Sequence, residues 1–228
     1  MNLLCGSFAV VAALMYNDLT LAFWLIVAGI VFDFFDGFVA RLLHSSSAIG
    51  VQLDSLADVI TSGLAPAAVL WQVCLQTEPC WLPEGWKLGY GVFVLAAFSA
   101  LRLAKFNIDE TQTVEFCGLP TPAGSLLCAS LGMLWQQGAV ALSSDGVLLV
   151  AVLTSLLLVS PIRMFALKFH GFGWRGNEVR YLFLLASIVL IIILRTYAIP
   201  VIIVLYIVVS AVRWLCMRSG NPDKAPKA

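Results

Sequence analysis

The sequence predicts an all-α protein, a polytopic transmembrane helical bundle of about eight helices. Three observations predict this class. Of 228 residues, 61% are hydrophobic and 11% charged, with a mean hydropathy of +0.97, which is typical of membrane proteins. The apolar residues form long runs that are divided by clusters of charged residues, glycine and proline. These runs are apolar on every face, which excludes the alternating strands of a membrane barrel and leaves helices.

Reading the apolar runs in order predicts eight spans: Asn2–Tyr16, Leu19–Leu43, Gly50–Gln76, Trp86–Asn107, Pro120–Gln137, Gly146–Met164, Val179–Arg195 and Ile199–Met217. The first is short for a hydrocarbon core of about 30 Å, which needs about 20 residues. We therefore expect it to lie inside the bundle, unless the chain begins further upstream. No cleavable signal peptide is predicted, because no basic segment precedes this first run.

The links between the spans complete the domain organisation. No repeat or linker divides the chain, so residues 1–217 are expected to form a single transmembrane domain and residues 218–228 a short polar tail. In the loop between the third and fourth spans, Trp81 and Trp86 are interpreted as anchors at the membrane interface.

An even number of spans divides the basic residues very unequally between the two sides of the membrane. Lys87 and Arg195 lie on one side. The other side holds Arg41, Arg102, Lys105, Arg163, Lys168, Arg175, Arg180, Arg213, Arg218, Lys224 and Lys227. Because cytoplasmic loops carry an excess of Lys and Arg, we expect the second side to face the cytoplasm in a cell or inner membrane.

The stretch from Asp33 to Asp58 places four carboxylates in an otherwise apolar region. Asp33 and Asp36 lie three residues apart on one helical face with Arg41, and Asp54 and Asp58 lie four apart on the next span. The link between the two spans is short, which makes them antiparallel. We therefore expect all four carboxylates to converge near the cytoplasmic membrane surface.

Converging carboxylates inside a membrane need a neutralising partner. One Asp at the centre of a membrane helix costs about 2.5 to 3.5 kcal/mol on insertion. Oxygen ligands suit Mg2+ or Mn2+, which readily share their coordination with substrate phosphates. The stretch therefore predicts a site for two divalent ions at Asp33, Asp36, Asp54 and Asp58, a common clamp for displacement at phosphorus. Gly37 and Gly50 would let a ligand approach closely, and Arg41 can bind phosphate. The alternative is a set of structural acids paired with arginine.

The spacing of these residues resembles the CDP-alcohol phosphotransferases, whose pattern is D-x2-D-G-x2-A-R-x8-G-x3-D-x3-D. Every fixed position is filled, by Asp33, Asp36, Gly37, Ala40, Arg41, Gly50, Asp54 and Asp58. Three more stretches resemble the integral-membrane phosphatidylserine synthase branch of this family: Asp54–Pro66, Leu101–Asn107 and Gly118–Gly124. The likeness runs from about Asn2 to Arg180.

The resemblance implies that the phosphatidyl group of CDP-diacylglycerol is transferred to L-serine, giving phosphatidylserine and CMP. It implies metal binding by Asp33, Asp36 and Asp54, with Asp58 as both metal ligand and general base. The CDP-diacylglycerol donor would contact Gly37, Ala40, Arg41, Ser47 and Gly50. Family members are often dimers, so a homodimer in membrane lipid is expected by analogy.

Two cations are the candidates for binding serine. Arg102 and Lys105 lie three residues apart at the cytoplasmic end of the fourth span, so both can face one cavity and bind either an acceptor carboxylate or the donor phosphates. The alternative is that both are anchors whose charged ends reach the membrane surface. Relatives often have Arg in place of Lys105. The basic loop from Phe165 to Arg180 could also contact lipid phosphate, although positive-inside anchoring explains most of its charge.

Several other functions are disfavoured by composition or remain as rivals. The net charge of zero gives no case for nucleic-acid binding, and the six cysteines form no C-x-x-C pair for zinc or redox chemistry. A sister enzyme that uses glycerol 3-phosphate or inositol is the nearest rival. A cation transporter is a more distant one, because intramembrane carboxylates also mark ion pathways.

Overall fold

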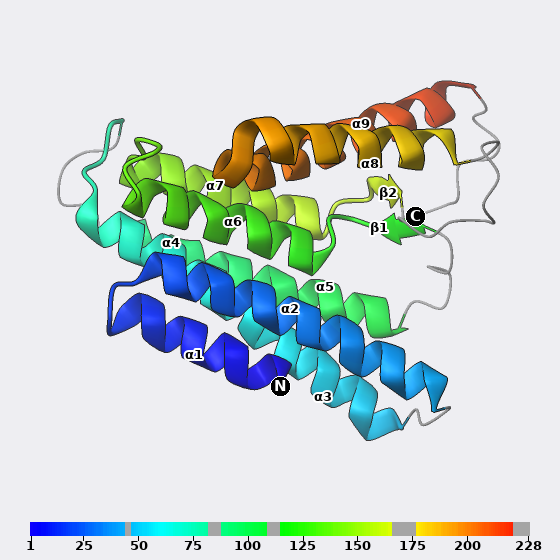
Figure 1. Cartoon of the computed structure of the whole chain (residues 1–228), viewed down its shortest axis with the longest axis horizontal. Helices are drawn as coiled ribbons and strands as arrows, with labels where there is room; N and C mark the ends of the chain where they lie inside the picture. The colour runs from blue at the N-terminus through cyan, green and yellow to red at the C-terminus, as the bar shows by residue number, and fades with distance from the viewer. Residues whose placement is uncertain (44–46, 82–87, 109–114, 166–176, 221–228) are drawn as a thin grey trace.

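The structure is a computed structural model, described here for residues 1–43, 47–81, 88–108, 115–165 and 177–220 (Figure 1). These residues are mostly helical, as predicted. The α-helices are α1 (Asn2–Leu14), α2 (Leu19–Leu42), α3 (Ala48–Asp58), α4 (Ala65–Gln76), α5 (Val94–Ile108), α6 (Thr121–Gln136), α7 (Ser144–Leu158), α8 (Glu178–Leu194) and α9 (Ala198–Gly220). They are joined in places by the π-helix η1 (Val59–Leu64) and the 3-10 helices η2 (Leu88–Phe93) and η3 (Arg195–Tyr197).

Each predicted span overlaps a helical segment, but the prediction for Gly146–Met164 runs too far, because that helix ends at Leu158 and Arg163–Phe165 is a strand. Not every helical segment is long enough to cross a membrane. Within the described residues, four segments are long and apolar enough: Leu19–Ala40, Ile49–Gln76, Gly89–Ile108 and Glu178–Cys216, the last comprising α8 and α9. Helices α1 and α7 are apolar but shorter. An integral membrane protein is consistent with these segments, and the number of eight crossings stays a prediction.

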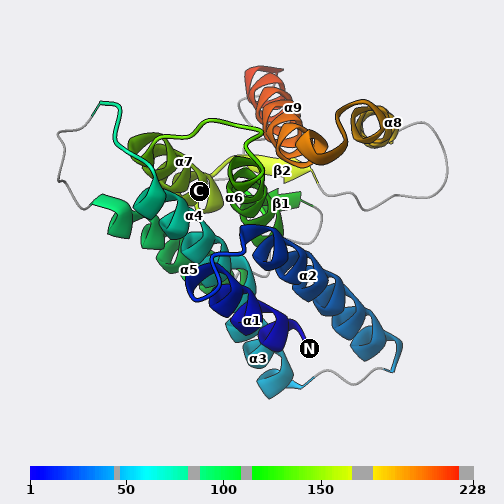
Figure 2. The ribbon, with the colours of Figure 1, turned by 60° about the vertical axis from the view of Figure 1, so that its left-hand side comes forward.

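The helices run roughly along one long axis, and their shared core lies in the middle of the bundle (Figures 1 and 2). Helix α6 packs against both α2 and α4, and residues such as Phe23, Leu70 and Leu134 are fully or almost fully buried there. Helices α8 and α9 form a hairpin at one side, and many large apolar side chains of α8 are exposed, as expected for a surface in lipid.

Helix α1 packs into the bundle by only one of its faces. Ala9, Ala12 and Ala13 are buried, because small side chains let α1 approach α2 and α4 closely. The opposite face exposes Phe8 and Val11. The expectation that this short helix lies inside the bundle therefore holds for its alanine face.

The predicted third span is one helical segment that changes its winding directly after Asp58. The π-helix η1 lies between α3 and α4, and Pro66 follows it in the first turn of α4. Proline has no N–H to donate to the carbonyl of Ser62, four residues back, so a regular α-helical ladder cannot continue there. The widened turn buries Thr61, Ser62 and Gly63 against neighbouring helices.

A two-stranded antiparallel sheet is the departure from an all-helical chain among the described residues. Strand β1 (Glu115–Cys117) pairs with β2 (Arg163–Phe165) at the end of the bundle where α2 ends and α3 begins, hereafter the aspartate end (Figure 1). Gly118 follows β1 with a φ of 77°, and a Cβ there would overlap the carbonyl oxygen of Leu158. Only glycine fits this connection to α6 without strain.

The structure describes the start of the predicted C-terminal tail, but not the predicted loop residues Trp86, Lys168 and Arg175. Helix α9 continues to Gly220, so the predicted tail from residue 218 begins as helix. Residues 221–228, together with Trp86, Lys168 and Arg175, lie outside the described residues.

Candidate active site

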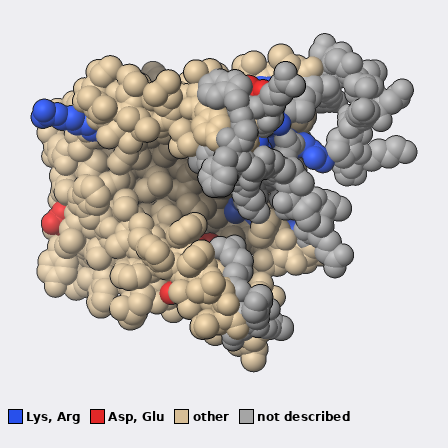
Figure 3. Space-filling view, turned by 45° about the vertical axis from the view of Figure 1, so that its right-hand side comes forward, with Lys and Arg blue, Asp and Glu red and all other residues tan. Residues whose placement is uncertain are grey.

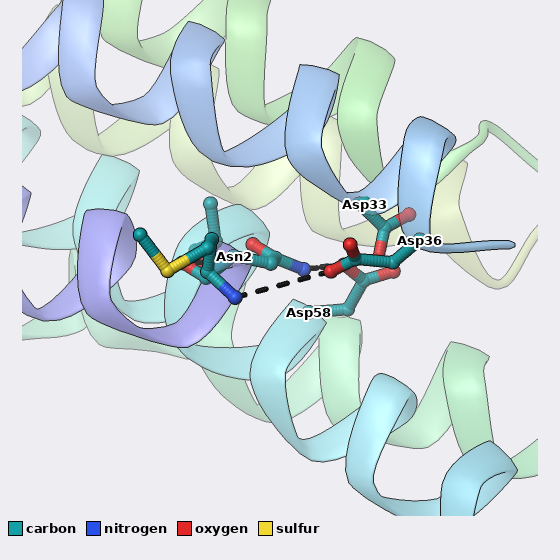
Figure 4. A network of polar contacts seen from close by, with 6 residues as sticks. Asn2, Asp33, Asp36 and Asp58 are labelled. Atoms are coloured by element: carbon teal, nitrogen blue, oxygen red, sulfur yellow. Dashed lines mark hydrogen bonds and ion pairs between the residues drawn. The ribbon is translucent and has the colours of Figure 1, made fainter. Parts of the chain in front are cut away.

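The amide of Asn2 joins two of the predicted aspartates. Its nitrogen Nδ2 donates hydrogen bonds to Oδ1 of Asp33 at 3.0 Å and to Oδ1 of Asp58 at 2.9 Å (Figure 4). Asp33 lies on α2 and Asp58 is the last residue of α3, so three helices meet at this point. The predicted convergence of the two acidic stretches is therefore present for this pair.

The other two predicted aspartates lie around this pair. Asp54, one turn before Asp58 on α3, is close enough to interact electrostatically with both Asp33 and Asp58. Asp36, one turn after Asp33, is exposed, and its Oδ2 lies 3.9 Å from the terminal ammonium of Met1 (Figure 4). Asp54 is thus near the bridged pair, and Asp36 lies at its edge.

The donor set of this cluster fits a hard divalent cation. Asp33, Asp54 and Asp58 offer carboxylate oxygens, which are the ligands that Mg2+ and Mn2+ prefer. The amide of Asn2 is neutral and does not itself offset any of their negative charge. As placed, no three Asp, Glu, His or Cys side chains of the described residues are grouped tightly enough to hold an ion. Metal binding by Asp33, Asp36, Asp54 and Asp58 therefore stays a prediction.

The predicted donor-binding residues lie on both sides of the link between α2 and α3. The position that a Cβ of Gly37 would occupy has no atom within 4 Å, so packing within the chain does not require a glycine there. Ala40 is half-buried, and the Arg41 side chain lies outside the described residues. The Ser47 hydroxyl accepts the Gly50 N–H at 3.0 Å and caps α3, which is a structural role for both residues.

Arg102 is a buried cation on α5 beside the aspartates. Its side chain is 8% exposed and is close enough to interact electrostatically with Asp58. Its Nη1 donates a hydrogen bond to the Thr121 hydroxyl at 2.9 Å, and its Cζ lies 5.7 Å from the ring centroid of Phe106. Its Nε has no hydrogen-bond partner. A buried guanidinium with a free N–H can bind an anionic group of a ligand.

The structure separates the two cations that were predicted to bind serine. Lys105 is exposed, whereas Arg102 is buried, so the two do not share one environment. A spacing of three residues placed them on neighbouring parts of the helix surface, but the packing of α5 buries only one of these positions. Serine binding by Lys105 stays a prediction.

Helix α5 also fixes the position of α3. Asn107 Nδ2 donates a hydrogen bond to the Ser55 hydroxyl at 2.8 Å, and Ser55 lies between Asp54 and Asp58 in sequence. This contact connects the helix that carries Arg102 to the helix that carries the candidate base. A polar contact between two helices helps to hold them in register.

Figure 3 brings the aspartate end toward the viewer, and the face that it shows is hollowed across its middle. Both basic and acidic atoms are visible at the inner end of the hollow. Apart from these atoms, the visible wall of the hollow is mostly uncharged. A concave surface with a few charged groups at one end can hold a ligand that carries its charge at one end.

Two residues of this site were not predicted from sequence. Asn2 was missed because a single amide in an apolar helix has no periodic partner, although polar residues inside membrane spans are a signal of function. Thr121 was noted only as part of the Gly118–Gly124 stretch, and its contact with Arg102 depends on how α5 and α6 meet.

Comparison with known proteins identifies the family. The CDP-alcohol phosphatidyltransferase family matches residues 1–162, which include the whole acidic cluster and Arg102. The chain belongs to this family. Membership of this family favours phosphatidyl transfer over cation transport, which was the more distant rival.

Three relatives have the same printed name, CDP-diacylglycerol–serine O-phosphatidyltransferase. The Bacillus subtilis protein is 32% identical over 173 residues, covering 75% of this chain and 88% of the relative. The Helicobacter pylori strain 26695 protein is 32% identical over 203 residues, covering 86% and 80%. The Mycobacterium tuberculosis H37Rv protein is 32% identical over 240 aligned positions, covering 98% and 81%.

Proposed function

We propose that this phosphatidyltransferase uses CDP-diacylglycerol as donor and L-serine as acceptor, releasing CMP and phosphatidylserine. The observation that carries the proposal is the buried Arg102, with an unpartnered Nε, beside Asp58. Serine has a carboxylate and a hydroxyl two carbons apart. A carboxylate bound by Arg102 leaves the hydroxyl free to approach Asp58. The names of the relatives support the same acceptor.

In the proposed reaction, Asp58 accepts the proton of the serine hydroxyl as its oxygen attacks the phosphorus that bears diacylglycerol. The bond from that phosphorus to the CMP oxygen breaks, and CMP leaves. A positioned base of this kind contributes about 10²- to 10⁴-fold to a rate. Asp33, Asp36, Asp54 and Asp58 would hold the divalent cations. The chemistry that the bound cations supply is neutralisation of the pyrophosphate and of the departing CMP.

The remaining residues of the site bind and orient. Gly37 leaves open space beside α2, which suits close approach of the CDP group. The Thr121 hydroxyl fixes the Arg102 guanidinium. The aspartate end is proposed to face the cytoplasm, as the distribution of Lys and Arg predicts. A homodimer stays an expectation by family analogy.

The test is CMP release from labelled CDP-diacylglycerol by the purified protein with a panel of acceptors. We expect release with L-serine and a divalent ion, and none after chelation. Ethanolamine is the matched control, because it keeps the hydroxyl and amine of serine but lacks the carboxylate that Arg102 would bind. Release driven by glycerol 3-phosphate or inositol instead of serine would replace the acceptor assignment.

A further inference from the structure

Asn2 occupies a position at which one side chain contacts two residues of the candidate active site, Asp33 and Asp58. It is the first residue of α1, and it is only 4% exposed. Its Nδ2 carries two hydrogens, and one is directed to Asp33 and the other to Asp58. These two aspartates lie on different helices, so a single amide sets the distance between them.

The chemistry of a carboxamide suits this position. A hydrogen bond to a carboxylate is stronger than one between neutral groups, so two such bonds hold both carboxylates firmly. A lysine would offset one of the two negative charges and compete with a cation, and an aspartate would add a further negative charge. The amide orients both acids while leaving their charge for a metal ion.

The amide is itself held in place by the surrounding helices. The backbone carbonyl of Asn2 accepts a hydrogen bond from the buried Thr61 hydroxyl of η1 at 3.1 Å. A Cβ on Gly29 would lie 3.2 Å from Asn2 Oδ1, so α2 approaches the amide closely. Asn2 Oδ1 is buried without a hydrogen-bond partner, which leaves the two aspartates as the polar contacts of this side chain among the described residues.

We propose that Asn2 is a positioning residue for the phosphatidyl transfer, holding Asp33 of α2 and Asp58 of α3 at the separation that cation binding and proton transfer require. The inference rests on the proposed function. Groups that orient metal ligands typically change metal affinity or activity by about 10- to 100-fold when they are removed. Serine binds at Arg102 in this scheme, so its KM should depend little on Asn2.

The test compares Asn2→Ala and Asn2→Leu with the purified wild type. Leucine has nearly the shape of asparagine, so it keeps the packing against Gly29 while removing both hydrogen-bond donors. Mn2+ binding is measured directly by electron paramagnetic resonance, without substrates. We expect Mn2+ affinity to fall by about 10- to 100-fold in both variants. We also expect kcat to fall, with the KM for serine changing less than about threefold.

Gln136→Ala is the matched control, because Gln136 also clamps α2 by its amide. Its Oε1 accepts the backbone N–H groups of Leu19 and Thr20 at 2.9 and 3.0 Å, at the other end of that helix. We expect this variant to lower the melting temperature but to keep the wild-type Mn2+ affinity.

Each outcome decides the inference. Wild-type Mn2+ affinity and kcat in a folded Asn2 variant would overturn it, and so would failure of both variants to fold, which would assign Asn2 a structural role. If the wild type released no CMP with any acceptor, the proposed function would fail, while the Mn2+ titration would still decide whether Asn2 positions the two aspartates.

Discussion

Asp58 combines two expected roles at the level of a single residue, because it lies within the carboxylate cluster and next to Arg102. In Asp58→Asn the side chain keeps its size but cannot accept the serine proton. We expect kcat to fall by about 10²- to 10⁴-fold. Mn2+ binding should weaken but persist, since Asp33, Asp36 and Asp54 remain. Serine-dependent CMP release should be measured beside Mn2+ titration, and normal turnover would refute the assignment of the base.

Thr121 gives a second test at this scale. Thr121→Val removes the hydroxyl that Arg102 Nη1 donates to, within a buried pair. A hydrogen bond to a charged group contributes about 1.5–3 kcal/mol, so we expect the KM for serine to rise by about 10- to 100-fold. The kcat should change much less. Steady-state kinetics at varied serine concentration measure both constants.

The control for this substitution is Thr154→Val. Thr154 is also a buried threonine, but it lies on α7 and its hydroxyl accepts a hydrogen bond from the Cys128 thiol. We expect it to change stability and to leave the KM for serine unchanged. An equal rise of that KM in both variants would show that general loosening of the bundle, and not the loss of the Arg102 contact, is responsible.

Residue spacing predicted part of the site for a physical reason. Asp33 and Asp58 are placed together by helical periodicity and a short link, which are local properties of the sequence. The bridging amide of Asn2 and the burial of Arg102 without Lys105 depend on how helices distant in sequence meet. Periodicity within one helix does not contain that information.

Helix α1 provides a prediction at the scale of elements, because its contact with η1 sets the position of Asn2. A Cβ on Gly6 would overlap the Thr61 hydroxyl and lie 2.8 Å from Thr61 Cα, so the backbones must separate. Overpacking of this kind costs about 1–3 kcal/mol. We expect Gly6→Ala to lower the melting temperature and kcat together.

Gly37→Ala is the matched comparison, because a Cβ at that position meets no atom within 4 Å. Its melting temperature should not fall, whereas the KM for CDP-diacylglycerol should rise if the donor approaches the backbone there. A drop in melting temperature equal to that of Gly6→Ala would contradict the difference in packing at these two glycines.

Asp145 fixes the end of the bundle opposite the aspartates and gives it a pH dependence. Hydrogen bonds from the Ser143 hydroxyl and the backbone N–H groups of Trp81 and Cys80 lower the pKa of Asp145 to about 2. Because the carboxyl pKa is lower in the folded state, the ionised side chain stabilises the fold at any pH above its unfolded pKa of about 3.9. This stabilisation is lost as the pH falls toward 2. Asp145→Asn should lower the melting temperature at pH 7.

Thermal unfolding in detergent at a series of pH values measures this effect. The difference between the wild type and Asp145→Asn should shrink between about pH 4 and pH 2, where the native carboxylate becomes protonated. A difference that stays constant over this range would mean that the charge of Asp145 does not stabilise the contact with residues 80 and 81.

Elements were predicted more completely than their details. Long apolar runs specify helices because a membrane leaves backbone polar groups no other partners, and the described part of each run is largely helical. The change of winding after Asp58 and the pairing of β1 with β2 were not predicted. The strand pairing, in which Phe116 lies opposite Met164, joins segments that are distant in sequence. The change of winding has a local signal in Pro66, but the close contact of Thr61 with α1 depends on how the helices pack.

On the scale of the whole molecule, the candidate active site and the Asp145 contacts lie at opposite ends of the long axis. The β1–β2 sheet, the end of α2 and the start of α3 lie at the aspartate end, whereas the start of α7, which carries Asp145, lies at the other end (Figure 1). A soluble CMP product must leave into water, and a lipid-linked donor must enter from the bilayer. A site near one membrane surface, as the sequence predicts, would serve both needs, and the orientation of the protein would then determine which compartment receives CMP.

Native cysteines can test that orientation. Cys80 is exposed beside Asp145 and Cys117 is exposed on β1, at opposite ends of the bundle. If the aspartate end faces the cytoplasm, a membrane-impermeant maleimide applied to intact cells should label Cys80, and Cys117 should react only after the membrane is opened. Peptide mapping by mass spectrometry measures both sites, and Cys80→Ser is the control that removes the external label. Labelling of Cys117 in intact cells would show the opposite orientation, with CMP released outside the cytoplasm. The distribution of Lys and Arg would then need another explanation.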